Sequence, residues 1–314
     1  MSLRRTTLPL AVSAGVVLAL TACSSPGSGG SGGGSGDGIA VLASFYPLQY
    51  VTQQVGGDLV QVDTLTPPGA EPHDLELSPA QVDAVGRADL VVYLSEFQAS
   101  VDDAVDANPP AHVVDAAQDT ELHAAEHGAD GEEHAEDDGH DHGSLDPHFW
   151  LDPSRLPAVA DDVAAQLAEI DPDHADEFQA NAEAFAQQMA DLDAEYATGL
   201  ASCESRTIVT THEAFSYLAE RYDLEQVGIS GVDPEGEPSP ARLAEVGKVV
   251  QDEGVSTIFF ETLASPKVAE TLADELGVDT AVLDPLEGLT DDTQDYVSVA
   301  RANLDTLRTA LSCA

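Results

Sequence analysis

Positive charge is scarce in this sequence. It has 11 Lys and Arg residues against 58 Asp and Glu residues, and its formal net charge is −47. Nucleic acids and anionic lipids are therefore poor partners, because both are bound through clusters of Lys and Arg. We interpret the acidity as a solubility feature or an adaptation of the source, although it also attracts metal cations.

Long hydrophobic runs are also missing, except for a short one at the start. Arg4 and Arg5 precede an apolar run over 8–20. A membrane-spanning helix needs about 20 apolar residues, so this run is too short to span and is typical of a secretory signal. We predict a signal peptide over 1–22 and an extracytoplasmic location for the rest of the chain.

The signal ends in Leu20-Thr21-Ala22-Cys23, which matches a bacterial lipobox. In such a sequence the cysteine is acylated and becomes the new N-terminus, so Cys23 would carry a lipid anchor in the cell membrane. Residues 23–38 are mostly Gly and Ser and predict a flexible tether. Removal of the signal makes the net charge two units more negative.

Cysteine is rare as well: besides Cys23 there are only Cys203 and Cys313. In an exported chain they are predicted to form one disulfide. The alternative is two free thiols. A thiolate metal site is disfavoured, because no further cysteine is present to complete it.

Apolar, β-branched runs alternate with helical stretches along the body of the chain. This order predicts an α/β fold with parallel sheets covered by helices. The predicted strands are 39–45, 59–65, 89–94 and 112–114 in the first half, and 207–211, 255–260 and 280–283 in the second. Helix starts are expected at Ser78-Pro79, Ser239-Pro240 and Ser265-Pro266.

A long helix is expected between the two halves. Residues 172–202 contain no strand signal, and their apolar side chains recur at helical spacing. We therefore predict an N-terminal lobe over 39–171, a stiff linking helix over 172–202 and a C-terminal lobe over 203–314.

Five of the ten histidines lie in one polar segment, 119–143, otherwise rich in Ala, Gly, Asp and Glu. Such a composition cannot form a core and predicts a disordered loop. The histidines of this loop are His123, His127, His134, His140 and His142. They suggest weak metal capture, and the alternative is a solvated insertion without a role.

Three other histidines are each expected in an ordered loop that follows a strand: His73, His148 and His212. Ligands of open parallel sheets gather beyond the carboxyl ends of the strands, so these side chains are expected to converge on one crevice. Taken singly, each of them would more often be a surface or core histidine.

Four motifs together resemble the metal-binding solute receptors of bacterial ABC importers, and are most similar to the zinc-receptor, ZnuA-like branch. They are Pro72-His73-Asp74, residues 146–153 (DPHFWLDP), residues 212–217 (HEAFSY) and residues 283–286 (LDPL). The resemblance extends over nearly the whole body from Ile39 onward, including the long helix and the His-rich loop.

The resemblance implies a metal ion in the cleft between the lobes, with two ligands from each lobe: His73 and His148, then His212 and Asp284. Some zinc receptors use an acidic residue beside the first histidine, or water, in place of the late aspartate. Three imidazoles and one carboxylate suit Zn²⁺, whereas Mn²⁺ prefers more oxygen ligands. Glu261 is either a group that orients a histidine ring or a carboxylate at a helix start.

The function implied by the resemblance is a monomeric, lipid-anchored receptor that captures zinc and delivers it to an ABC permease and its cytoplasmic ATPase. The sequence has no phosphate-binding loop and no spanning helix with which to drive transport itself. The alternatives are a manganese- or iron-specific receptor of the same family, or an exported zinc hydrolase. The His-Glu-x-x-His signature of many zinc hydrolases is absent, so we expect no enzymatic activity.

Overall fold

The structure, a computed structural model, describes residues 38–125 and 145–314. The signal, Cys23, nearly all of the tether and four of the loop histidines (His127, His134, His140 and His142) lie outside the described residues. The described residues fall into one compact unit, so the division into lobes at 171 and 203 stays a prediction. Among the described residues, no helix is both long and apolar enough to cross a membrane.

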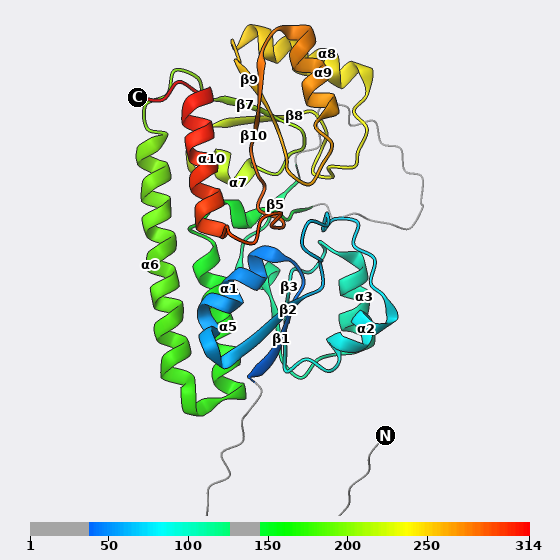
Figure 1. The fold of residues 1–314 in the computed structure, drawn as a ribbon, viewed down its shortest axis with the longest axis vertical. Helices are drawn as coiled ribbons and strands as arrows, with labels where there is room; N and C mark the ends of the chain where they lie inside the picture. The colour runs from blue at the N-terminus through cyan, green and yellow to red at the C-terminus, as the bar shows by residue number, and fades with distance from the viewer. Residues whose placement is uncertain (1–37, 126–144) are drawn as a thin grey trace, which may run out of the picture. The chain divides into compact units, whose positions relative to one another are not determined.

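The first half of the chain builds a parallel four-stranded sheet in the order β2-β1-β3-β4 (Figure 1). Its strands are β1 Ile39–Ala43, β2 Val60–Thr64, β3 Leu90–Tyr93 and β4 Val113–Asp115. The central strands β1 and β3 bury Val41, Leu90 and Val92 almost completely, as expected where helices cover both faces. All four predicted strands of this half are present.

The second half repeats the arrangement with the order β10-β9-β7-β8, again all parallel. Its strands are β7 Thr207–Thr210, β8 Glu225–Gly228, β9 Thr257–Phe260 and β10 Asp279–Val282. Strand β8 is not among the predicted strands, because Glu225 and Gln226 give this edge strand no apolar run. The predicted α/β class with two helix-flanked parallel sheets is confirmed.

The helices that flank the two sheets are capped much as the sequence indicated. They are α1 Tyr46–Gly56, α2 Pro79–Val85, α3 Ala99–Ala107, α4 Ala116–Asp119, α7 Ser216–Arg221, α8 Pro240–Asp252, α9 Lys267–Leu276 and α10 Tyr296–Ala310. The hydroxyls of Ser78 and Ser239 accept backbone N–H bonds at the starts of α2 and α8. Helix α9 starts one residue later than expected, at Lys267.

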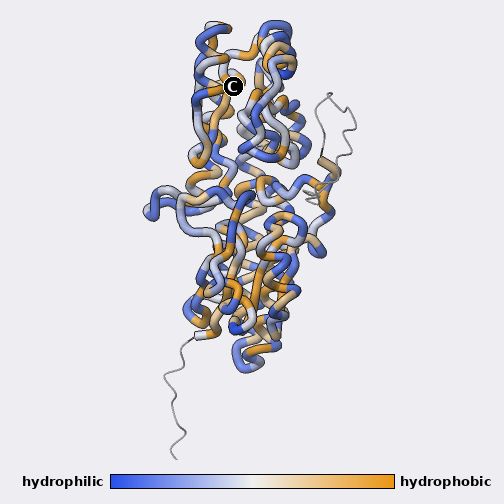
Figure 2. Tube along the Cα trace, turned by 90° about the vertical axis from the view of Figure 1, so that its right-hand side faces the viewer, coloured by the Kyte–Doolittle hydropathy of each residue, from blue (hydrophilic) through white to orange (hydrophobic). Residues whose placement is uncertain are grey.

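Two adjacent helices follow: α5 Leu156–Ile170 packs beside the first sheet, whereas the longer α6 Ala175–Gly199 extends alongside both sheets (Figure 1). Helix α6 is the expected long helix; the start of the predicted range, Pro172–His174, is a separate 3-10 turn. The buried side chains of α6 belong to one hydrophobic core cluster, which also contains side chains from strands of both sheets. Figure 2 shows hydrophobic segments mainly in the interior and hydrophilic ones along the outer turns.

The first residues of the predicted disordered loop are folded, so that prediction was wrong for residues 119–125. Asp119 ends α4, Thr120 is buried, and β5 (His123–Ala124) pairs antiparallel with β6 (Leu145–Asp146). The reason is contact with a residue distant in the chain: the backbone N–H of His123 donates to the Tyr217 hydroxyl at 2.8 Å, and the His123 ring stacks on that of Tyr217.

Cys203 and Cys313 form a disulfide in the structure. The bond joins the segment after α6 to the segment after α10, and the two residues also form an isolated β-bridge. It therefore closes a loop that contains the entire second sheet.

Candidate metal centre

Three histidines from three separate loops meet one glutamate. His73 lies in the loop after β2, His148 is two residues past the end of β6, His212 follows β7, and Glu287 lies in the loop after β10. One ligand atom from each of these four residues lies within 4.8 Å of all the others. Residues scattered over more than 200 positions thus form one cluster, because strands of both sheets end beside it.

The inner atoms of the cluster are the three Nε2 nitrogens and one carboxylate oxygen. Nε2 of His148 lies 3.3 Å from Nε2 of His73 and 3.3 Å from Nε2 of His212. Oε1 of Glu287 lies 3.4, 3.2 and 3.6 Å from the Nε2 atoms of His73, His148 and His212. All four side chains therefore direct a possible metal ligand at the same point.

Burial differs among the members of the cluster. The side chains of His148 and His212 are fully buried and that of Glu287 is 1% exposed, whereas that of His73 is 13% exposed. Solvent therefore reaches the cluster chiefly at His73. The edge of that ring packs against Phe97, with 4.8 Å between ring centres.

A carboxylate lies against the outer nitrogen of each fully buried histidine. Asp146 Oδ1 is 2.7 Å from Nδ1 of His148, and Glu261 Oε1 is 2.6 Å from Nδ1 of His212. Hydroxyls of the second half of the chain donate to both carboxylates, Ser216 to Asp146 and Thr211 to Glu261. A carboxylate at Nδ1 places the proton there and leaves the Nε2 lone pair free for a metal.

The charges of the cluster shift the pKa values of its members. For His148 and His212, burial lowers the pKa, but the neighbouring carboxylates outweigh burial and raise it. Burial lowers the pKa of His73. For Glu287, burial acts to raise the pKa, yet the three histidines hold it well below its usual range. Without a metal the cluster thus favours an anionic Glu287 and stabilises the protonated forms of His148 and His212, but not that of His73.

The predicted fourth ligand, Asp284, is outside this cluster, and this prediction requires correction. Its Oδ2 accepts from the Thr262 hydroxyl at 2.8 Å, and its Oδ1 accepts from the Leu286 N–H at 2.8 Å. The main chain of Asp284 is in turn bound by the side chain of Asn303. Asp284 therefore shapes the loop, and Glu287 supplies the carboxylate.

Glu287 was missed because its orientation depends on an unusual backbone conformation. Leu286 has φ of 60°, in the left-handed region that branched residues rarely adopt, and its side chain is buried. This turn directs Glu287 to the histidines. The sequence offers only a weak signal, an acidic residue three positions after Asp284 in the same loop.

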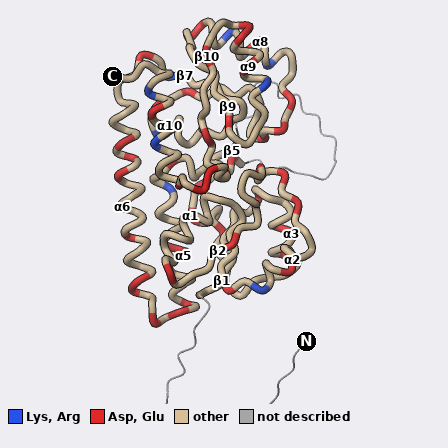
Figure 3. Tube along the Cα trace, viewed as in Figure 1, with Lys and Arg blue, Asp and Glu red and all other residues tan. Residues whose placement is uncertain are grey.

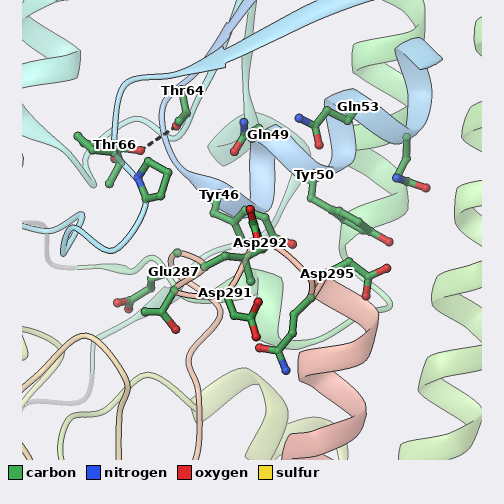
Figure 4. Close-up of a pocket in the computed structure, with 17 residues that line it drawn as sticks. Tyr46, Gln49, Tyr50, Gln53, Thr64, Thr66, Glu287, Asp291, Asp292 and Asp295 are labelled. Carbon is green, nitrogen blue, oxygen red and sulfur yellow. Dashed lines mark hydrogen bonds between the residues drawn. The ribbon is translucent and has the colours of Figure 1, made fainter. Parts of the chain in front are cut away.

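An acidic pocket of about 900 Å³ lies next to the cluster and shares Glu287 with it (Figure 4). Tyr46 and Tyr50 of α1 line one side of this pocket, and Asp291 and Asp295 line the other. In Figure 3 the acidic residues of the loop before α10 form a group near the centre of the view. Their charge favours cations near Glu287.

The remaining loop histidine in the described chain, His123, is held away from the cluster. Its Nε2 lies 3.0 Å from the Arg155 guanidinium, and its Nδ1 lies 3.3 Å from Glu220. The tight cluster thus contains three of the histidines singled out in the sequence, and not this one.

Three nitrogens and one oxygen at these positions fit a four-coordinate zinc ion. Neutral imidazoles and a carboxylate are usual zinc ligands, and four protein ligands leave no open position for a catalytic water. The donor set would also accept Cu²⁺ or Ni²⁺, because raw affinity follows the Irving–Williams order.

Comparisons with known proteins agree with this geometry. Residues 41–310 match the family described as zinc-uptake complex component A, periplasmic. The chain is 36% identical to the high-affinity zinc uptake system protein ZnuA of Bacillus subtilis, over 96% of this chain and 97% of that protein. It is also 36% identical to the zinc-binding lipoprotein AdcA of Streptococcus pneumoniae, over 93% of this chain but only 58% of AdcA.

The fold is similar to that of a solved zinc-bound relative. The structure of the Zn(II)-bound ZnuA-like domain of Streptococcus pneumoniae AdcA is 36% identical and has a TM-score of 0.72. The match covers 87% of this chain and 99% of that domain.

Proposed function

The chain belongs to the family of periplasmic zinc-uptake components, and on that premise we propose that it captures zinc outside the cytoplasm and delivers it to an ABC permease. The observation that carries this proposal is the convergence of three Nε2 atoms and one Glu287 oxygen on one point. Zinc is the proposed cargo rather than manganese, because the donor set is rich in nitrogen.

Several finer features belong to the same proposal. Acylation of Cys23 would anchor the mature protein, as a monomer, to the outer face of the cell membrane. The histidines between 127 and 142 would add weak zinc sites, and His123 would contribute less than the sequence suggested, because Arg155 and Glu220 already contact its ring. Delivery would require a membrane permease and a cytoplasmic ATPase.

The test of zinc binding is a calorimetric titration of the mature protein. We expect one tight equivalent of zinc per chain, and loss of this equivalent in His148→Ala and His212→Ala. The matched control is His174→Ala, because the His174 side chain is 43% exposed and pairs with Asp171 rather than with a residue of the cluster. Tight binding that survives both cluster substitutions would refute the proposed site.

The test of delivery uses cells that lack their own zinc receptor. We expect the intact protein to restore uptake of radioactive zinc, and His148→Ala to fail although it reaches the same membrane. Turnover of ester or peptide substrates by the zinc-loaded protein, abolished by His212→Ala, would instead support the exported hydrolase.

A further inference from the structure

Two glutamines, one in each half of the chain, make the same set of hydrogen bonds next to a histidine of the cluster. Nε2 of Gln98 donates to the Thr66 hydroxyl at 3.0 Å and to the Pro72 carbonyl at 3.1 Å. Nε2 of Gln226 donates to the Thr210 hydroxyl at 2.9 Å and to the His212 carbonyl at 3.1 Å. In both cases one amide group links a threonine at the end of a strand to a peptide adjoining a histidine.

The orientation of both amides is fixed by their acceptors. The Thr66 hydroxyl donates to the Ser44 carbonyl at 2.8 Å, and the Thr210 hydroxyl donates to the His212 carbonyl at 2.6 Å. Each hydroxyl therefore already donates its proton to a carbonyl and can only accept a hydrogen bond from the glutamine. A carbonyl also only accepts, so Nε2 rather than Oε1 must face both partners.

These bonds hold a histidine-bearing peptide at both ends. For the peptide between Pro72 and His73, Gln98 binds the carbonyl, and the Glu71 carboxylate accepts from the His73 N–H at 3.0 Å. For the peptide between His212 and Glu213, Gln226 binds the carbonyl, and the Glu213 N–H donates to the Gly231 carbonyl at 2.9 Å. A peptide plane bound at both ends cannot rotate, so the adjoining side chain keeps its direction.

The two glutamines come from different places in the fold. Gln98 is the residue before α3, whereas Gln226 lies within the edge strand β8. The shared pattern is thus not a simple consequence of the two sheets having the same strand order. In both places the hydrogen bonds of the glutamine fix a peptide that adjoins a histidine of the cluster.

We propose that Gln98 and Gln226 are positioning residues that limit the rate at which bound zinc leaves, each by fixing the peptide beside one histidine ligand. The proposal rests on zinc binding by the cluster as proposed above. Neither glutamine contacts the metal position, so each acts only through its histidine.

The effect should be larger for Gln98. His212 has a second constraint, because Glu261 lies 2.6 Å from its Nδ1. In the described ranges 38–125 and 145–314, no hydrogen bond or ion pair is made by Nδ1 of His73. Gln98 is also the more buried of the two glutamines. Its removal leaves the buried Thr66 hydroxyl without this donor, and it leaves the Pro72 carbonyl with only the 3.3 Å bond from the Leu75 N–H.

The test compares zinc dissociation rates of the mature protein, measured by transfer to a coloured chelator. We expect Gln98→Met, which keeps the shape but removes both donors, to release zinc about tenfold faster, and Gln226→Met about threefold faster. The matched control is Asn181→Leu, which removes a 2.9 Å bond to the Val55 carbonyl and should leave the rate unchanged.

Cobalt absorption spectra separate positioning from loss of a ligand. Both glutamine variants should retain the wild-type four-coordinate cobalt spectrum while releasing metal faster, which a loss of fold or of a ligand would not produce. Thr66→Val removes one acceptor of the Gln98 amide and should give a smaller increase, which tests the proposal even if Gln98→Met does not fold.

Wild-type dissociation rates in both glutamine variants, or a larger effect for Gln226→Met than for Gln98→Met, would overturn the inference. Failure of the unmodified protein to retain zinc would instead refute the proposed function. The two failures are therefore distinguishable.

Discussion

The identity of the fourth ligand gives the sharpest prediction, because two carboxylates of one loop compete for the role. Glu287→Gln replaces the one anionic group of the cluster with a neutral amide of the same size. Its Oε1 lies within 3.2–3.6 Å of all three Nε2 atoms, so the substitution acts at the metal position itself. Asp284→Asn is the matched control, since Asp284 contacts Thr262 and Leu286 instead.

The magnitude follows from what each carboxylate touches. Residues that only orient a metal ligand typically contribute 10–100-fold to affinity. A residue that binds the metal directly should contribute at least as much as the upper value, so we expect about 100-fold weaker zinc binding for Glu287→Gln, or ~2.7 kcal/mol. For Asp284→Asn we expect a change of less than about threefold, because the remaining Oδ1 still accepts from the Leu286 N–H.

The assay is competition with a chelator of known zinc affinity at pH 7.5, with both variants checked for folding by circular dichroism. A large loss of affinity in Asp284→Asn together with wild-type affinity in Glu287→Gln would refute the assignment from the structure. It would restore the ligand expected from the sequence.

Three further predictions concern pH, ring orientation and the disulfide. Against the effect of burial, neighbouring carboxylates raise the pKa of His212 to about 10 and also raise that of His148, so zinc competes with protons for these rings. Affinity measured by competition should therefore fall about tenfold or more per unit between pH 7.5 and 5.5, and a flat profile would contradict histidine ligation. Asp146→Asn should weaken zinc binding about 10–100-fold without changing the stoichiometry, and unaltered affinity would show that the contact to Nδ1 does not orient the ring. Replacement of Cys203 and Cys313 by serine should lower the free energy of unfolding of the metal-free protein by at most about 4.7 kcal/mol in urea titrations, with one tight zinc retained; loss of that zinc would mean that the bond also shapes the cluster.

Local sequence determined the layout of the chain. Alternating apolar runs and helical spacing placed seven of the strands and the long helix, and serine-proline pairs marked helix starts, because these signals depend on neighbours a few residues away. Edge strand β8 was not foreseen, since Glu225 and Gln226 owe their strand conformation to pairing with β7. The start of the His-rich loop was misjudged for the same reason: His123 is held by Tyr217, which is distant in the chain.

The sequence also selected the three histidines of the cluster, because each lies in a distinctive motif after a strand or a tight turn. It could not select the carboxylate. Asp284 and Glu287 are three positions apart in one loop. Which of them faces the histidines depends on the left-handed conformation of Leu286 and on the hydrogen bonds between the Asn303 side chain and the main chain of Asp284. Those interactions exist only once β10 and α10 are packed together, so tertiary structure alone decided the ligand set.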